Sequence, residues 1–147
     1  MDVARKQDKG KANDGDGEQK KREWLYIGPT AKELREEIDD DRARDEIFLA
    51  LREAAAGLRP SIAKDWKGQG SGVWELAITR KDAHRCVILI RYADVLYVCA
   101  AFKKKSHEGR KTPTHIVDKV NRRIAAAEAD YKRRQAKWEQ QSKHGEE

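Results

Sequence analysis

Three consecutive lysines, Lys103, Lys104 and Lys105, follow directly after an apolar, β-prone run at residues 95–102. Arg85 lies inside a second such run, where an arginine rarely serves solvation alone. Together these residues place several cations at the rim of a small sheet, and a guanidinium can bind a phosphate through two parallel hydrogen bonds. Neighbouring ammonium groups also lower one another's pKa, which a lysine needs in order to act as a base. The pattern predicts a site that holds a polyanion or performs phosphate chemistry.

Each of these features has a structural alternative that the sequence leaves open. The lysine run could be a solvated strand end that discourages edge-to-edge pairing of sheets. Arg85 could form a buried salt bridge with Glu75 on the neighbouring predicted strand, and this role is compatible with phosphate binding. The partners of these side chains therefore decide between the two interpretations.

A polar loop before the β-rich part of the chain contains Lys64, Trp66 and Lys67. An indole between two ammonium groups can stack on a base while the lysines hold its phosphate. The alternative is a tryptophan that folds over the edge of the hydrophobic core. Both interpretations stay open at the level of sequence.

Histidine titrates near neutral pH, so His84, His107 and His115 are acid–base candidates, although none stands at a ligand or triad spacing. Cys86 and Cys99 occupy neighbouring predicted strands without a CxxC motif or a Cys/His cluster of zinc spacing. We interpret the cysteines as small, reduced core residues. No metal and no cofactor is expected.

Length and charge restrict the classes of function. The chain has 147 residues, with 32 lysines and arginines, 26 aspartates and glutamates, and a formal net charge of +6. This length allows one domain with one core and excludes an enzyme with separate cofactor and substrate domains. The positive charge favours nucleic acid, the ribosome or an acidic protein surface as partner. Because no run of about 20 apolar residues and no secretory signal is visible, a cytoplasmic location is expected.

Hydrophobic periodicity predicts the order β-α-α-β-β-β-α, an α+β domain in which helices pack against an antiparallel sheet. A disordered charged tail is expected at residues 1–22, the domain at 23–138 and a polar tail at 139–147. Strands are expected at residues 24–27, 73–79, 84–92 and 95–102, the last three forming a meander. Helices are expected at residues 31–39, 41–57 and 112–138, with Thr30 capping the first and Thr112-Pro113 opening the last.

Several short motifs follow one another in a fixed order around these elements. They are Lys64-Asp65-Trp66-Lys67-Gly68, Gly72-Val73-Trp74-Glu75-Leu76, Arg85, Ala101-Phe102-Lys103-Lys104-Lys105-Ser106 and Lys111-Thr112-Pro113. In this combination the chain resembles the HigB-like, phage-derived branch of the RelE/ParE toxin superfamily over residues 24–131. The resemblance implies a small RelE-like domain that is the toxin of a type II toxin–antitoxin pair. Such toxins are typically mRNA interferases that cleave RNA on the ribosome, and a helix-turn-helix antitoxin silences them.

Metal-independent RNA cleavage needs a base for the 2′-hydroxyl, cations beside the phosphate and an acid for the leaving 5′-oxygen. The candidates for catalysis are Arg85, Lys104, Lys103 and His84. The candidates for binding RNA or phosphate are Lys64, Trp66, Lys67, Trp74, Lys105 and Lys111. The resemblance gives Arg85 the role of phosphate clamp, and it implies an endoribonuclease that inhibits translation.

Two departures from the family pattern keep other functions open. Ala77 follows Leu76 where members often carry a basic residue, which removes one expected phosphate contact. His84 stands where an aromatic residue commonly precedes the strand arginine, so it either supplies an acid–base group or only replaces a ring. The alternatives are a non-enzymatic inhibitor of DNA gyrase, as in the ParE branch, and a phage-type accessory protein that binds nucleic acid.

Overall fold

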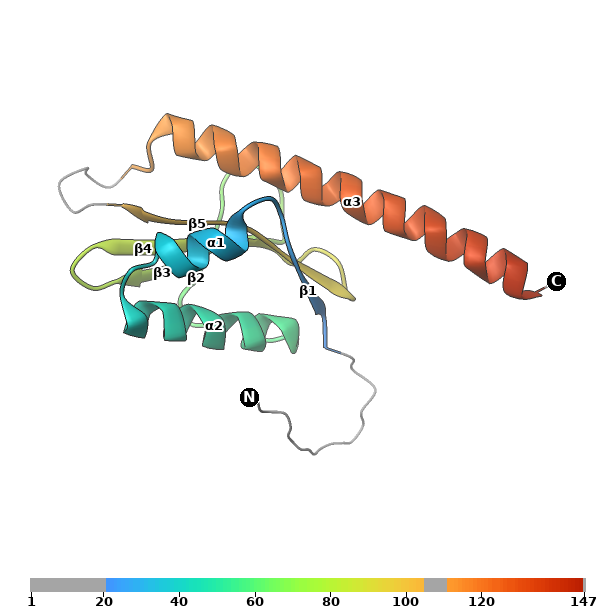
Figure 1. Cartoon of the computed structure of the whole chain (residues 1–147), viewed down its shortest axis with the longest axis horizontal. Coiled ribbons are helices and arrows are strands. Elements are labelled where there is room, and N and C mark those ends of the chain that lie inside the picture. Colours follow the sequence, from blue (N-terminus) through green and yellow to red (C-terminus); the bar gives the residue numbers. More distant parts are fainter. Residues whose placement is uncertain (1–20, 105–110, 147) are drawn as a thin grey trace, which may run out of the picture.

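The computed structural model describes residues 21–104 and 111–146, so the predicted tail lies outside the described residues except for Lys21 and Arg22. The strands are β1 (Glu23–Tyr26), β2 (Ala63–Asp65), β3 (Val73–Thr79), β4 (Ala83–Leu89) and β5 (Val95–Lys104) (Figure 1). The helices are α1 (Thr30–Glu36), α2 (Asp41–Ala55) and α3 (Thr114–Glu146). The predicted α+β class is confirmed.

The five strands form one sheet in the order β1-β5-β4-β3-β2. The predicted meander is confirmed, because β3, β4 and β5 pair antiparallel with their chain neighbours. β1 instead pairs parallel with β5, so the sheet is mixed rather than antiparallel throughout. The short strand β2 pairs antiparallel with β3 and is missing from the predicted elements, because its three residues lack the apolar alternation of a strand.

Side chains alternate along the strands and build two cores, one on each face of the sheet. The core beneath α1 and α2 contains Leu34, Ile47, Leu51, Leu76, Ile78, Cys86, Ile88, Leu96, Val98 and Ala101. The core beneath α3 contains Val73, Val87, Leu89, Tyr97, Cys99, Phe102, Val120, Ile124 and Ala127. Figure 1 shows α3 along one side of the sheet and α2 along the other. We call these sides the α3 face and the α1–α2 face. Both cysteines are buried and free of disulfides, as expected.

A β-bulge in β5 determines which face the end of this strand presents. Val87 pairs with Ala100 whereas the next residue, Ile88, pairs with Val98, so Cys99 is the extra residue. Cys99 and Ala100 consequently both belong to the core beneath α3 although they are adjacent in sequence. Every later residue of β5 is thereby shifted by one position relative to a regular strand.

The helix bounds differ from the prediction at two starts and at all three ends, with α1 ending at Glu36 and α2 at Ala55. Thr30 is the first residue of α1 and not its cap, because its hydroxyl donates a hydrogen bond of 2.5 Å to the carbonyl of Ile27. Pro113 precedes α3, and its carbonyl accepts from the backbone N–H groups of Ile116 and Val117. α3 continues to Glu146, and its C-terminal half extends past the sheet (Figure 1). Among the helices described, none is both long enough and apolar enough to cross a membrane.

Candidate nucleic-acid interface

The four predicted catalytic residues lie in two groups on opposite faces of the sheet. His84 and Arg85 are neighbours on β4 and therefore point to opposite faces, and the same holds for Lys103 and Lys104 on β5. The register places His84 opposite Lys103 on the α1–α2 face. Arg85 is opposite Phe102, so Arg85 and Lys104 share the α3 face. A single catalytic centre cannot contain all four.

Arg85 forms an ion pair with Glu75, which is the structural role considered for it in the sequence. The Arg85 Nε atom lies 3.2 Å from the Glu75 carboxylate, and the two side chains are 14% and 16% exposed. The Nη1 atom donates a longer hydrogen bond of 3.3 Å to the carbonyl of His84. The Nη2 atom makes no hydrogen bond or ion pair to any described residue. The guanidinium is thus held in place through its Nε and Nη1 atoms.

Two lysines lie on the same face as this ion pair. Lys64 on β2 is the cross-strand partner of Glu75, and residues so paired have their Cβ atoms about 5 Å apart. Lys104 follows Phe102 by two residues on β5 and is 5% exposed. We call Lys64, Glu75, Arg85 and Lys104 the basic row. It brings three cations and one carboxylate from four strands to one face of the sheet.

The two tryptophans proposed for stacking lie on different faces. Trp66 is 7% exposed in the core beneath α3, and its Nε1 atom donates a hydrogen bond of 3.1 Å to the side chain of Asn121. Trp66 therefore takes the second of the two roles considered for it, a tryptophan that folds over the edge of the core. Trp74 belongs to the α1–α2 face, where the Arg59 guanidinium lies 4.9 Å from its ring centroid. A base that reaches the basic row therefore does not meet Trp74.

The remaining binding candidates are loop lysines. Lys67 is exposed directly after Trp66, and Lys111 is exposed shortly before α3. Lys105 lies outside the described residues. The structure therefore leaves Lys67 and Lys111 accessible to an anionic partner.

The loop after Trp66 is held against α3 rather than left loose. The Arg91 guanidinium donates to the carbonyls of Gln69, at 2.7 Å, and Ser71, at 3.0 Å, and it also pairs with Glu128 of α3. Gly72 has a φ of +83°, and a Cβ atom there would lie 2.9 Å from the Arg91 Cα. These contacts fix the segment that carries Lys67.

His84 and Lys103 belong to a polar cluster beneath the loop between α1 and α2. The Lys103 ammonium lies 2.7 Å from Asp39 and 3.8 Å from Asp82. The hydrogen bond to Asp39 raises the pKa of Lys103, which is the opposite of the shift that a lysine base needs. His84 is 2% exposed, and its Nδ1 atom has no hydrogen-bond partner within the described part of the chain. Lys103 is thus placed to hold the loop against the sheet, and His84 is buried beside it.

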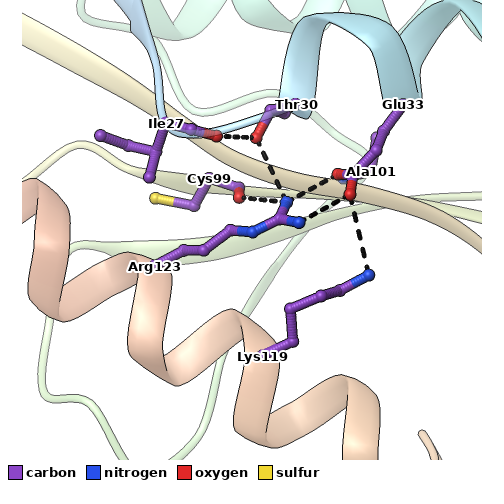
Figure 2. A network of polar contacts seen from close by, with 7 residues as sticks. All are labelled: Ile27, Thr30, Glu33, Cys99, Ala101, Lys119 and Arg123. Carbon is purple, nitrogen blue, oxygen red and sulfur yellow. Dashed lines mark hydrogen bonds and ion pairs between the residues drawn. The ribbon is translucent and has the colours of Figure 1, made fainter.

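A buried network that the sequence did not predict joins α1, β5 and α3 (Figure 2). The Arg123 guanidinium donates two hydrogen bonds of 2.7 Å to the carboxylate of Glu33. It also donates to the Cys99 carbonyl at 3.1 Å, while the Glu33 carboxylate accepts from the Ala101 N–H, also at 3.1 Å. Pairing of β1 with β5 ends at Val98, so these side chains replace the backbone partners that β1 no longer supplies.

The electrostatics of this network favour the ionised carboxylate. Burial raises the pKa of Glu33, but the hydrogen bonds from Arg123 and Ala101 and the nearby Lys119 ammonium outweigh it, so that the pKa is lowered. Lys119 lies 3.7 Å from the carboxylate. The only sequence signal for the network is an arginine directly before Ile124 on a helix whose apolar face is buried. The network fixes α3 to the sheet. It therefore also determines which part of the α3 face the helix covers.

The mixed five-stranded sheet between a helical pair and a long C-terminal helix is consistent with a small RelE-like α+β domain. The family model described as phage-derived protein Gp49-like (DUF891) matches residues 29–125, which include the whole basic row. The chain therefore belongs to the Gp49-like phage-derived family, a RelE-like toxin family of toxin–antitoxin systems. Comparisons with curated proteins and with solved structures gave no match.

Proposed function

We propose that the protein is the toxin of a type II toxin–antitoxin pair, of the HigB-like kind. It acts as a metal-independent endoribonuclease that cleaves mRNA on the ribosome and so inhibits translation. The family membership supports the toxin role. The observation that carries the RNA role is the basic row, in which Lys64, Arg85 and Lys104 share one face of the sheet.

In this proposal Arg85 binds the scissile phosphate. Its Nε atom is engaged by Glu75, so the guanidinium is held in place before the ligand binds and can donate to the phosphate through Nη2. Lys104, on the strand next to Arg85, stabilises the negative charge that grows on the phosphate in the transition state, an effect that is stronger where water is partly excluded. Lys64, on the far side of Glu75, contacts a neighbouring phosphate. The exposed Lys67 and Lys111 contact neighbouring phosphates and add the salt-dependent part of the affinity.

The proposed partner is a helix-turn-helix antitoxin encoded with the toxin. A protein that covers the basic row with acidic side chains would neutralise Lys64, Arg85 and Lys104 and exclude RNA at the same time. This gives the antitoxin a physical route to silencing that needs no change of fold.

Induced expression in bacterial cells tests the proposal, with mRNA 5′ ends mapped by sequencing. The wild-type chain should arrest growth and create new 5′ ends that are phased with codons, and Arg85→Ala should create none. Arg52→Ala is the matched control, because Arg52 is exposed on α2 at the opposite side of the sheet. A folded Arg85→Ala chain that still arrests growth and produces the same 5′ ends would contradict the role of the basic row.

One observation favours a second candidate, inhibition of DNA gyrase without cleavage. Ala77 is the cross-strand partner of Arg85, so the family's frequent basic residue is missing directly beside the proposed phosphate clamp. DNA supercoiling measured in the same cells separates the two functions. Altered supercoiling with unchanged mRNA ends would favour gyrase inhibition.

A further inference from the structure

Glu75 is the acidic member of an otherwise cationic row. It lies on β3 between the Arg85 guanidinium, 3.2 Å away, and its cross-strand partner Lys64. Its side chain is 16% exposed, so it stands at the margin of the core beneath α3 rather than inside it. A carboxylate in its ionised form can accept a proton.

Of the four predicted catalytic residues, only Arg85 and Lys104 lie on the face proposed to bind RNA, and the proposal already uses the charge of Lys104 to stabilise the phosphate. His84 and Lys103 lie on the opposite face of the sheet, beneath the loop between α1 and α2. Arginine is effectively never deprotonated in proteins, so Arg85 cannot accept the proton. Glu75 shares the α3 face with Arg85 and is in direct contact with it.

We infer that Glu75 is the general base of the RNA cleavage, which rests on the proposed function. Its carboxylate takes the proton of the 2′-hydroxyl of the nucleotide before the scissile bond. The 2′-oxygen then forms a bond to phosphorus while the bond from phosphorus to the 5′-oxygen breaks. The leaving 5′-oxygen takes a proton from solvent water, and the products are a 2′,3′-cyclic phosphate and a 5′-hydroxyl.

The ion pair with Arg85 places the base next to the phosphate that it serves. Arg85 holds the Glu75 carboxylate through Nε and offers Nη2 to a phosphate oxygen, so one planar group positions both reactants. Lys64, the cross-strand partner of Glu75, adds a positive charge on the other side of the carboxylate. The same contact that the sequence suggests as purely structural thereby positions the catalytic carboxylate.

The test uses the purified full chain and ribosomes programmed with a short mRNA, under single-turnover conditions. Glu75→Gln keeps the shape of the side chain and an oxygen acceptor for Arg85, but it cannot take up the proton at neutral pH. We expect cleavage to slow by about 100-fold or more, the usual contribution of a general base. Affinity for a 2′-deoxy mRNA, which cannot be cleaved, should change by less than about threefold, a difference below 1 kcal/mol.

The control variant is Asp41→Asn, which alters another carboxylate in an arginine ion pair, at the start of α2 on the opposite side of the sheet. Its cleavage rate should match that of the wild type. A substrate with sulfur in place of the leaving 5′-oxygen separates base from acid, because a thiolate leaves without a proton. On this substrate the cleavage rate of Glu75→Gln should be lower than that of the wild type by the same factor as on the ordinary mRNA.

Four results would overturn the inference. Glu75→Gln could cleave within tenfold of the wild type, or the sulfur substrate could restore its rate, which would make Glu75 an acid instead. Loss of affinity for the 2′-deoxy mRNA in parallel with the rate would make Glu75 a binding or structural residue. A wild-type chain that leaves the mRNA intact would overturn the proposed function itself, and the role of Glu75 with it.

Discussion

Replacing Arg123 by methionine removes the centre of the network that joins α1, β5 and α3. The variant loses two hydrogen bonds of 2.7 Å to Glu33 and one of 3.1 Å to the Cys99 carbonyl. Methionine keeps most of the aliphatic packing on α3. The Glu33 carboxylate, whose side chain is 12% exposed, is left without its main counter-ion.

The size of the effect follows from what remains around the carboxylate. Removing one partner of a buried ion pair typically costs about 3–5 kcal/mol. The Ala101 N–H still donates to Glu33, and Lys119 is near enough to supply partial compensation at 3.7 Å. We therefore expect a loss of about 3 kcal/mol in the free energy of unfolding, at the low end of that range. For a domain with a total stability of about 5–15 kcal/mol this is a large fraction.

Urea unfolding followed by tryptophan fluorescence and circular dichroism measures this loss. Arg133→Met is the control, because Arg133 is 71% exposed and lies 3.4 Å from Asp130 in an ion pair within one helix. Such a surface pair contributes less than about 1 kcal/mol. A loss below 1 kcal/mol for Arg123→Met, or one no larger than for the control, would refute the structural role of the network.

The pH dependence provides an internal check on the same network. The pKa of Glu33 is lowered in the folded state from its ordinary value of 4.5, so its ionisation stabilises the fold at pH values above 4.5. This contribution is lost as the pH falls through the lowered pKa. Arg123→Met should reduce this contribution of Glu33 ionisation to the free energy of unfolding. The difference in free energy of unfolding between wild type and variant should therefore become smaller as the pH falls. Urea unfolding at several pH values measures this difference.

Two further predictions follow from the backbone and from the core. Gly72→Ala should lower the free energy of unfolding by about 1–3 kcal/mol, because φ is +83° and the new Cβ meets the Arg91 backbone at 2.9 Å. A thermal melt with no change would contradict this. Burial raises the pKa of Cys99 to about 12 and that of Cys86 still further, so neither thiol should react with a disulfide reagent at pH 8 until denaturant is added. Rapid reaction of the folded protein would contradict the burial of both.

The apolar elements of the fold could be predicted from the sequence because their periodicity is strong. β3, β4 and β5 are runs of alternating or continuous apolar residues with short turns between them, and all three were expected. The direction of β1 could not be predicted, since a strand has the same period in a parallel and an antiparallel pair. β2 has only three residues and acquires its conformation from its partner β3.

The sequence predicted which residues belong to the candidate site, but not how they are arranged on the two faces of the sheet. Alternation along a strand already implies that His84 and Arg85 point to opposite faces. The side taken by Lys104 depends on the bulge at Cys99, which the sequence does not reveal. The link between Glu33 and Arg123 spans 90 residues and is created by the fold, so no local pattern could indicate it.

The central claim is that the basic row binds and cleaves mRNA through Arg85. Its most direct test is a purified system in which the wild-type chain or Arg85→Ala is added to ribosomes programmed with one mRNA, and the 5′ ends of the products are mapped. The account predicts a cut within the codon in the ribosomal A site with the wild type, and intact mRNA with an equally folded Arg85→Ala. The same cut with Arg85→Ala, or intact mRNA with the wild type, would contradict it.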